Sequence, residues 1–193
     1  MDDLNATIGA SIAEHRAVAA LMDDVVPDIA SAAEAMIASA LAVGTLLVCG
    51  NGGSAADAQH IAAEYVGRFL RERRPLPAIA LHTNASAVTA ISNDYGFEAV
   101  FERQVRAHGR SGDVLLALST SGGSANVVAA VLAERKIGMT TIALCGAAGG
   151  AVSKACDIAI DVPTDVTPRV QEMHILVGHI LCDLVEEAVC ERP

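Results

Sequence analysis

The chain has 193 residues, of which 52% are hydrophobic, so it can build a domain with a substantial core and is not a disordered chain. Aromatic residues make up only 3%, and the core must therefore consist of Ala, Val, Leu and Ile. The formal net charge of −10 excludes nucleic acid as the expected main partner, because phosphate backbones are bound by clustered Lys and Arg. No apolar run approaches the roughly 20 residues that span a bilayer, so we expect no membrane segment.

Two helices are predicted at the N-terminus. The first is indicated by apolar residues at about helical spacing, namely Leu4, Ile8, Ile12, Val18 and Met22. Pro27 opens the second helix and Gly44 ends it. Because the second helix is apolar on several sides, we expect it to be buried, in part between subunits.

After Gly44, short apolar runs alternate with helical stretches. The predicted strands are Thr45–Cys49, Ala78–Leu81, Val114–Leu118, Thr140–Cys145 and Ile158–Val162. The predicted helices are Ser54–Leu70, Ala85–Asn93, Phe97–Ala107, Ser124–Lys136, Gly149–Ala155 and Pro168–Glu187. This alternation predicts an α/β fold, a three-layer sandwich around a five-stranded parallel sheet of the flavodoxin-like kind. We expect one domain, 1–193, with a helical pair at 1–44 and an α/β core at 45–193.

The cysteines and the one basic cluster have ordinary interpretations. The five cysteines are dispersed without a C-x-x-C pair, and MDDLNATIGA lacks the pattern of a signal peptide, so we expect reduced thiols in the cytoplasm. Cys49 and Cys145 end apolar runs, where cysteine usually serves as a small buried hydrophobic residue. The basic cluster is interpreted as a solvated helix end and loop and consists of Arg68, Arg71, Arg73 and Arg74.

Glycine-rich loops follow the first and third predicted strands. They read Gly50-Asn51-Gly52-Gly53-Ser54 and Ser119-Thr120-Ser121-Gly122-Gly123-Ser124. Glycines let the backbone approach a ligand closely, and the free N–H groups at the start of the following helix offer an anion site. A single glycine-rich loop also occurs at an ordinary tight corner between a strand and a helix. Two such loops at the ends of two strands are a more specific sign of an anion site. The many neutral donors fit a phosphate monoester best.

Two nucleotide-binding patterns fit less well. Gly50-x-Gly52-x-x-Ala55 matches a loose dinucleotide fingerprint, which requires an acidic residue near the end of the second strand to hold the ribose. The chain there reads Leu81-His82-Thr83-Asn84, without an acid. No lysine follows either glycine run, so the P-loop pattern also fails.

Four side chains form a set that could bind a metal. His60 and Glu64 are four residues apart and face the same way from their helix. Gln171 and His179 lie about 80° apart around the last helix, so both can face one cavity. Two imidazoles, a carboxylate and an amide oxygen suit zinc or a similar divalent ion, although a single His–Glu pair is more often surface chemistry. His174, on the same last helix, could instead face the core or a partner.

Four segments carry a resemblance that covers nearly the whole chain. They are CGNGGSAADAQHIAAEY (49–65), ISNDYGFEAVF (91–101), STSGGSAN (119–126) and RVQEMHILVGH (169–179). Together they resemble the bacterial phosphoheptose isomerase family, which belongs to the sugar isomerase (SIS) fold family. The resemblance implies an aldose–ketose isomerase that converts sedoheptulose 7-phosphate to D-glycero-D-manno-heptose 7-phosphate through an enediol, for surface polysaccharide precursors. It also implies a homotetramer with active sites at subunit interfaces, and one Zn²⁺ per subunit.

The resemblance further implies roles for individual residues. The metal ligands would be His60, Glu64, Gln171 and His179. Glu64 and His179 would carry out the acid–base chemistry. We favour Glu64 as the base and His179 as the proton donor to oxygen, although the sequence does not decide between the two assignments. The substrate would be bound by Asn51, Gly52, Gly53, Glu64, Asn93, Asp94, Ser119, Thr120, Ser121, Ser124 and Gln171. Asn93-Asp94 taken alone could equally be a helix-ending turn. The loop CGAAGG (145–150) is poorer in polar residues than the resemblance leads us to expect.

Two alternatives compete with this function. The first is a non-catalytic SIS domain that binds a sugar phosphate or a replication initiator, and the His60, Glu64, Gln171 and His179 set speaks against it. The second is arabinose 5-phosphate isomerase, an enzyme whose family commonly carries additional C-terminal domains.

Overall fold

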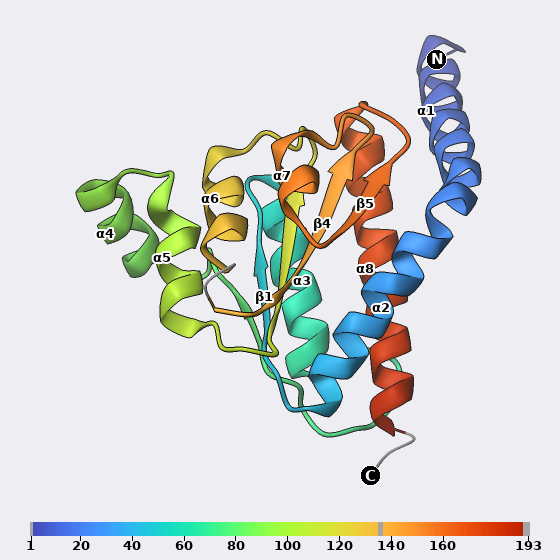
Figure 1. Cartoon of the computed structure of the whole chain (residues 1–193). Coiled ribbons are helices and arrows are strands. Elements are labelled where there is room, and N and C mark those ends of the chain that lie inside the picture. Colours follow the sequence, from blue (N-terminus) through green and yellow to red (C-terminus); the bar gives the residue numbers. More distant parts are fainter. Residues whose placement is uncertain (1, 135–136, 191–193) are drawn as a thin grey trace.

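The computed structural model of the chain describes residues 2–134 and 137–190, which form three layers around a parallel sheet (Figure 1). The sheet order is β2-β1-β3-β4-β5, and every neighbouring pair is parallel. The strands are β1 (Leu46–Cys49), β2 (Ala78–Ala80), β3 (Val114–Ser119), β4 (Thr140–Gly146) and β5 (Ile158–Val162). This confirms the predicted α/β class and the flavodoxin-like strand order.

Helices cover both faces of this sheet. Two of them lead into the fold, α1 (Asp2–Leu21) and α2 (Val26–Leu41), joined by a short 3-10 turn at Met22–Val25. The others are α3 (Gly53–Val66), α4 (Ala85–Tyr95), α5 (Ala99–His108), α6 (Ala125–Glu134), α7 (Gly150–Ala155) and α8 (Thr167–Cys190). The expected end of the sixth helix, at Lys136, lies outside the described residues.

Successive residues of each buried strand contribute to different layers of the core. In β3, Val114, Leu116 and Leu118 pack into the cluster that contains α2, α3 and α8. Leu115 and Ala117 pack on the other side, in the cluster that contains α5, α6 and α7. All of β3 is buried, because both faces of a parallel sheet are covered by helices. Cys49 and Cys145 are fully buried among these apolar residues, as expected.

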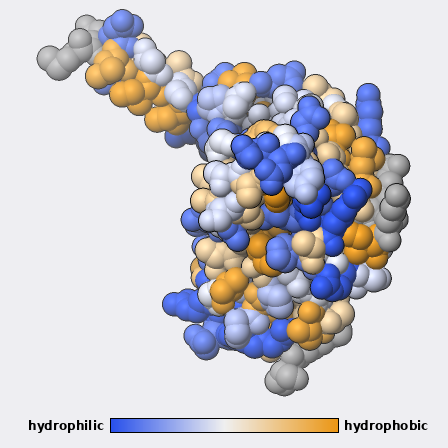
Figure 2. Space-filling model, turned by 90° about the vertical axis from the view of Figure 1, so that its left-hand side faces the viewer, coloured by the Kyte–Doolittle hydropathy of each residue, from blue (hydrophilic) through white to orange (hydrophobic). Residues whose placement is uncertain are grey.

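The two leading helices are covered to different extents by the rest of the chain. The apolar face of α2, with Ala32 and Met36, is covered within the chain by α8 and the sheet. α1 exposes more apolar residues along its length, where Leu4 is 65% exposed and Ile8 is 50% exposed. Figure 2 shows α1 standing clear of the rest of the molecule with hydrophobic residues on its surface. The expected burial of α2 is therefore confirmed within the chain, its burial between subunits stays a prediction, and α1 exposes a further apolar stripe.

A polar cluster fastens the second half of α1 to α8. Arg169 is almost buried and donates to the carbonyl and the hydroxyl of Ser11 and to the Glu172 carboxylate. His15 contacts the other oxygen of Glu172 at 2.7 Å. Glu172 and Arg169 are thereby engaged in holding α1. Across residues 2–134 and 137–190, no helix has the length and apolar character needed to cross a membrane.

Candidate active site

The two glycine-rich loops lie side by side. β1 sits between β2 and β3, where the strand order reverses, and Cys49 of β1 is in register with Ala117 of β3. A reciprocal amide pair joins the loops, since Asn51 Nδ2 donates to Asn126 Oδ1 at 2.8 Å and Asn126 Nδ2 donates back at 3.0 Å. Ligands bind at such reversal points in open α/β sheets, so the location matches the predicted anion site.

The first loop is formed around two glycines. Gly52 has φ +56°, a backbone conformation that favours glycine, and it turns the chain into α3. A Cβ on Gly53 would lie 2.1 Å from Nε2 of Gln171, so the Gln171 amide rests directly against the loop. The structure therefore brings Gln171 to the anion loop at the start of α3.

The second loop presents hydroxyl groups in a fixed arrangement. Ser119 and Ser124 share a hydrogen bond of 2.9 Å between their Oγ atoms. Ser121 is exposed, and its Oγ accepts from the N–H of Gly123 at 3.3 Å, which leaves its hydroxyl hydrogen free to donate. Thr120 is half-buried beside it. Neutral donors thus line this side of the site, as the sequence predicted.

The loop CGAAGG supports the serine loop through its backbone. Gly122 has φ +63°, and a Cβ there would lie 1.9 Å from the carbonyl oxygen of Gly149. The N–H of Val152 donates to the carbonyl of Gly122 at 2.9 Å. Gly122 and Gly150 permit this close approach, since a Cβ on Gly150 would lie 2.5 Å from the carbonyl oxygen of Gly122.

Helices α3 and α8 run side by side in the same direction from these loops. Gly53 meets Gln171 near the start of each helix, and His60 meets His179 about two turns further along. The two Nε2 atoms are 3.0 Å apart, and Glu64 Oε1 is 3.4 Å from His60 Nε2. The structure therefore gathers His60, Glu64 and His179, while Gln171 lies about 12 Å up the helix axis at the loop.

The spacing of the two imidazoles suits a shared metal ion. Two nitrogens bound to one tetrahedral zinc at 2.0–2.1 Å are about 3.3 Å apart, close to the distance between His60 and His179. Glu64 adds a carboxylate oxygen from the same face of α3. Within residues 2–134 and 137–190, however, no three His, Cys, Asp or Glu side chains form a ready metal-binding group. The imidazole and carboxylate donors of His60, Glu64 and His179 fit a zinc ion in type, whereas the amide of Gln171 lies against Gly53.

Asn93 and Asp94 are not brought to this cluster within the chain. They lie on α4, a helix without a single buried residue, on the sheet face opposite α3 and α8 (Figure 1). The amide of Asn93 donates to Asp94 at 2.8 Å. A cavity beside the first loop is lined by Asn51, His82 and Val88, so α4 borders the loop region while its C-terminal end remains exposed.

His174 is a core residue. Its side chain is fully buried, and Nε2 donates to the Cys145 carbonyl at 3.3 Å. Burial lowers the pKa of His174 to about 4, against the smaller opposing effect of that hydrogen bond. Of the two roles left open by the sequence, the structure supports packing in the core.

Sequence reasoning missed three features of the site. Asp57 shares a face of α3 with His60 and Glu64, and burial raises its pKa while His60 opposes that rise. Asn126, within STSGGSAN, holds Asn51 in place. Phe69 lies against His179 with ring centroids 5.3 Å apart. Helical spacing alone could have identified Asp57, three residues before His60, whereas Phe69 lies in a segment that was predicted as helix.

The fold and the paired loops define the class to which the protein belongs. The family model of the SIS domain matches residues 14–146, and this range includes both loops. Proteins of similar sequence identify a narrower family within this class. The chain is 58% identical to a phosphoheptose isomerase of Rhodospirillum rubrum over 88% of this chain and 90% of that protein.

Solved structures agree with that relationship. A phosphoheptose isomerase from Neisseria gonorrhoeae superposes with a TM-score of 0.90 and 45% identity over 95% of this chain and 99% of that one. One from Francisella tularensis superposes with a TM-score of 0.92 and 38% identity over 97% and 100%. The chain belongs to the phosphoheptose isomerase family of SIS-domain proteins.

Proposed function

We propose that the chain is an aldose–ketose isomerase that converts sedoheptulose 7-phosphate to D-glycero-D-manno-heptose 7-phosphate through an enediol. The observation that carries the proposal is the course of α3 and α8, which run side by side from the two anion loops to His60, Glu64 and His179. The family relationship supplies the class of substrate. The residues of the whole chain are proposed to form one SIS domain.

The phosphate end of the substrate is assigned to the loops. The hydroxyls of Ser119, Thr120, Ser121 and Ser124 and the N–H groups at the start of α3 would donate to the phosphate oxygens. Asn51, held by Asn126, and the bare backbone of Gly52 and Gly53 leave room for close approach.

The spacing along α3 supports a long sugar. His60 is seven residues beyond Gly53, or about 10 Å along the helix axis. An extended chain advances about 1.2 Å per bond, so the eight bonds from phosphorus to C1 of a seven-carbon ketose 7-phosphate also reach about 10 Å. The carbons that exchange the proton would therefore lie beside His60, Glu64 and His179, whereas a five-carbon substrate would fall about two bonds short.

Glu64 and His179 would carry out the proton transfers. Isomerisation moves a proton between C1 and C2, which needs a base at carbon and an acid at the carbonyl oxygen. Glu64 is 22% exposed on the side of α3 that faces His179, and we assign it as the base. His179 is assigned as the group that protonates oxygen. Asn93, Asp94 and Gln171 would contact the sugar hydroxyls.

We also propose one Zn²⁺ per subunit, held by His60, Glu64, Gln171 and His179. The 3.0 Å separation of the two imidazole nitrogens supports His60 and His179 as members of this set. Gln171, whose amide rests against Gly53 in this structure, would have to turn away from the loop to join them. When bound, zinc would polarise the substrate's carbonyl oxygen.

The active unit is proposed to be a homotetramer with active sites at subunit interfaces. The exposed apolar residues of α1 and the lack of buried residues in α4 support it. Asn93 and Asp94 could then reach a site formed with another subunit. The proposed location is the cytoplasm, where the product would enter heptose synthesis for lipopolysaccharide and related surface polysaccharides.

The non-catalytic binding module is not favoured. A binding domain needs the anion loops, but it has no need of His60, Glu64 and His179 gathered where the carbonyl end would lie.

An assay across ketose phosphates of five to seven carbons tests the proposal. The seven-carbon substrate should be turned over fastest, a chelator should reduce that turnover, and added zinc should restore it. Preference for a five-carbon substrate would reject the proposed substrate, and full activity in a protein shown to be metal-free would reject the zinc assignment.

A further inference from the structure

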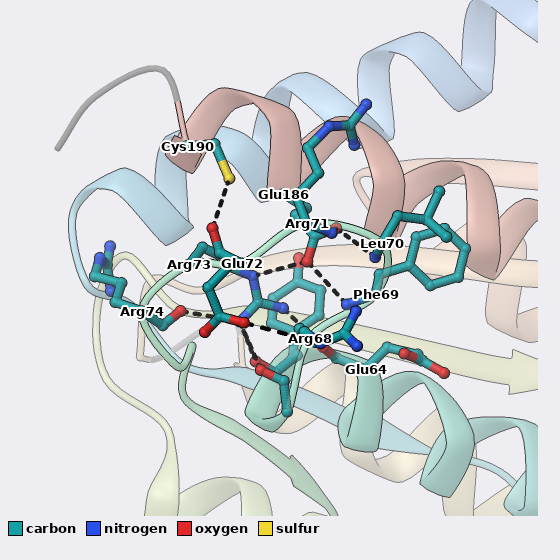
Figure 3. Close-up of polar contacts among 12 residues, drawn as sticks. Glu64, Arg68, Phe69, Leu70, Arg71, Glu72, Arg73, Arg74, Glu186 and Cys190 are labelled. Carbon is teal, nitrogen blue, oxygen red and sulfur yellow. Dashed lines mark hydrogen bonds and ion pairs between the residues drawn. The ribbon is translucent and has the colours of Figure 1, made fainter.

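A buried carboxylate organises the segment that follows α3. Glu186 of α8 is fully buried, and its two oxygens accept hydrogen bonds from three consecutive backbone N–H groups. Phe69 donates to Oε1 at 2.8 Å, while Leu70 and Arg71 donate to Oε2 at 2.6 Å each (Figure 3). This segment was predicted as the last turn of a helix, but the helix ends at Val66 and the chain instead wraps around Glu186.

Arg73 completes the cluster and caps α3. Its side chain is only 3% exposed, and Nε lies 3.2 Å from Glu186 Oε1. The guanidinium donates to the carbonyls of Glu64 at 2.7 Å and Tyr65 at 2.9 Å, which have no intrahelical partner because the helix stops (Figure 3). The interpretation of the four arginines as a solvated cluster is therefore wrong for Arg73, which is a buried cation at a helix C-terminus.

The cluster contacts both halves of the proposed catalytic site. Arg73 binds the main chain of Glu64 itself, and Glu186 holds the main chain of Phe69, whose ring packs on His179. Glu186 and His179 lie on the same helix, two turns apart. Glu186 therefore links α8 to the end of α3 at the level of the proposed base and acid.

A charged carboxylate is needed for this arrangement. Burial by itself would raise the pKa of Glu186, but the three N–H donors and Arg73 outweigh burial and lower it. A glutamine at this position keeps one acceptor oxygen and turns an NH₂ group toward N–H donors and a buried guanidinium. The segment at 69–71 would then lose its anchor.

We propose that Glu186, acting through Arg73 and Phe69, is a positioning residue that sets Glu64 and His179 in their catalytic geometry. The proposal rests on the proposed isomerase function for its kinetic consequence, and on the structure alone for the placement of His179.

The test compares Glu186→Gln with Glu187→Gln, the same substitution at the next, solvent-exposed residue of α8. Small misplacements of catalytic groups are costly, so Glu186→Gln should lower kcat roughly 10- to 100-fold, with KM for sedoheptulose 7-phosphate nearly unchanged because the loops are untouched. The imidazole proton resonances of His179 should shift as the Phe69 ring moves, while those of exposed His108 stay in place. Glu187→Gln should match the wild type in all three.

Three results decide the matter. An unshifted His179 resonance and a wild-type kcat in folded Glu186→Gln would overturn the proposal, even if its melting temperature falls. A wild type without isomerase activity would reject the proposed function, and the His179 resonance would still test the positioning. If Glu186→Gln does not fold, Phe69→Leu keeps the carboxylate and its donors, and it should lower kcat with KM unchanged. A normal kcat in Phe69→Leu would then overturn the proposal.

Discussion

Single side chains in this protein are placed by what surrounds them more than by their type. His60, His174 and His179 occupy one short stretch of α3 and α8, yet two of them meet at the proposed catalytic site and the third is enclosed in the core. His174 donates through Nε2 to a carbonyl, and its Nδ1 is buried without a partner among the described residues. An imidazole in that setting strongly prefers to be neutral.

His174 makes stability depend on pH. Its pKa is about 4 when folded and 6.5 for an ordinary histidine, so the unfolded chain binds more protons between these values and stability falls as the pH drops below about 6.5. Between about pH 7.5 and about pH 5 this effect should remove roughly 2 kcal/mol. Urea unfolding at both pH values, compared with His174→Gln, measures it. Equal losses in the two proteins would show that His174 contributes nothing to the pH dependence.

Sequence could predict the chemical types in the site but not every contact. The spacing of His60 and Glu64 on one helix and the composition of both loops follow from local patterns, and the structure places the two loops side by side and His60 and Glu64 beside His179. No local sequence pattern predicts the role of Glu186, because a single acidic residue near a helix end is normally solvated. Its role depends on a segment more than 110 residues earlier in the chain.

Among the elements, the sheet was the most predictable part. Continuous apolar runs indicated parallel strands that are buried on both faces, and glycine-rich corners follow two of these runs. The strand order β2-β1-β3-β4-β5 then brings the two glycine-rich loops together. The end of α3 was less predictable. Helical periodicity continues past Gly67, but the backbone N–H groups of Phe69 to Arg71 bind Glu186 instead of continuing the helix. A tertiary contact thus overrides a local preference.

Two glycines in the loops provide a test of how the elements meet. A Cβ at Gly122 would strike the backbone of Gly149, which cannot move aside, and φ is positive there, so Gly122→Ala should cost roughly 1–3 kcal/mol of stability. A Cβ at Gly53 would strike only the amide end of Gln171, which is flexible. Gly53→Ala should therefore leave stability nearly unchanged but change the zinc affinity, because it forces the amide of Gln171, a proposed ligand, to leave its place against the loop.

Denaturant unfolding and metal titration of the two variants separate these effects. A Gly122→Ala protein as stable as the wild type would contradict the backbone contact between the second loop and CGAAGG. Unchanged zinc affinity in Gly53→Ala would remove Gln171 from the proposed ligands.

At the scale of the whole molecule, α1 and α4 are the two helices that remain largely exposed to solvent in a single chain. Leu4, Ile8 and Ile12 are about half exposed or more on α1, and they contribute apolar surface that is unusual for a helix standing clear of its domain. The periodicity of α1 was predicted correctly, whereas its placement was not predicted at all, because a sequence pattern does not say which surface an apolar stripe meets.

Light scattering tests the proposed assembly. At low micromolar concentration the mass should be four times the 19.8 kDa of one chain, and Ile8→Glu with Ile12→Glu should lower it by placing charges in the interface. A stable, active monomer would reject interface active sites.

The central claim is that the site formed by the two loops with His60, Glu64 and His179 isomerises a sugar phosphate with Glu64 as the base. Proton NMR of sedoheptulose 7-phosphate incubated in D₂O with the wild type and with Glu64→Gln tests it most directly. We expect the wild type to form the aldose and to exchange deuterium at the C1–C2 carbons, and we expect Glu64→Gln to lower both rates by about 10²- to 10⁴-fold, the usual contribution of a general base. Aldose formation by Glu64→Gln at the wild-type rate, or none by the wild type, would contradict the account.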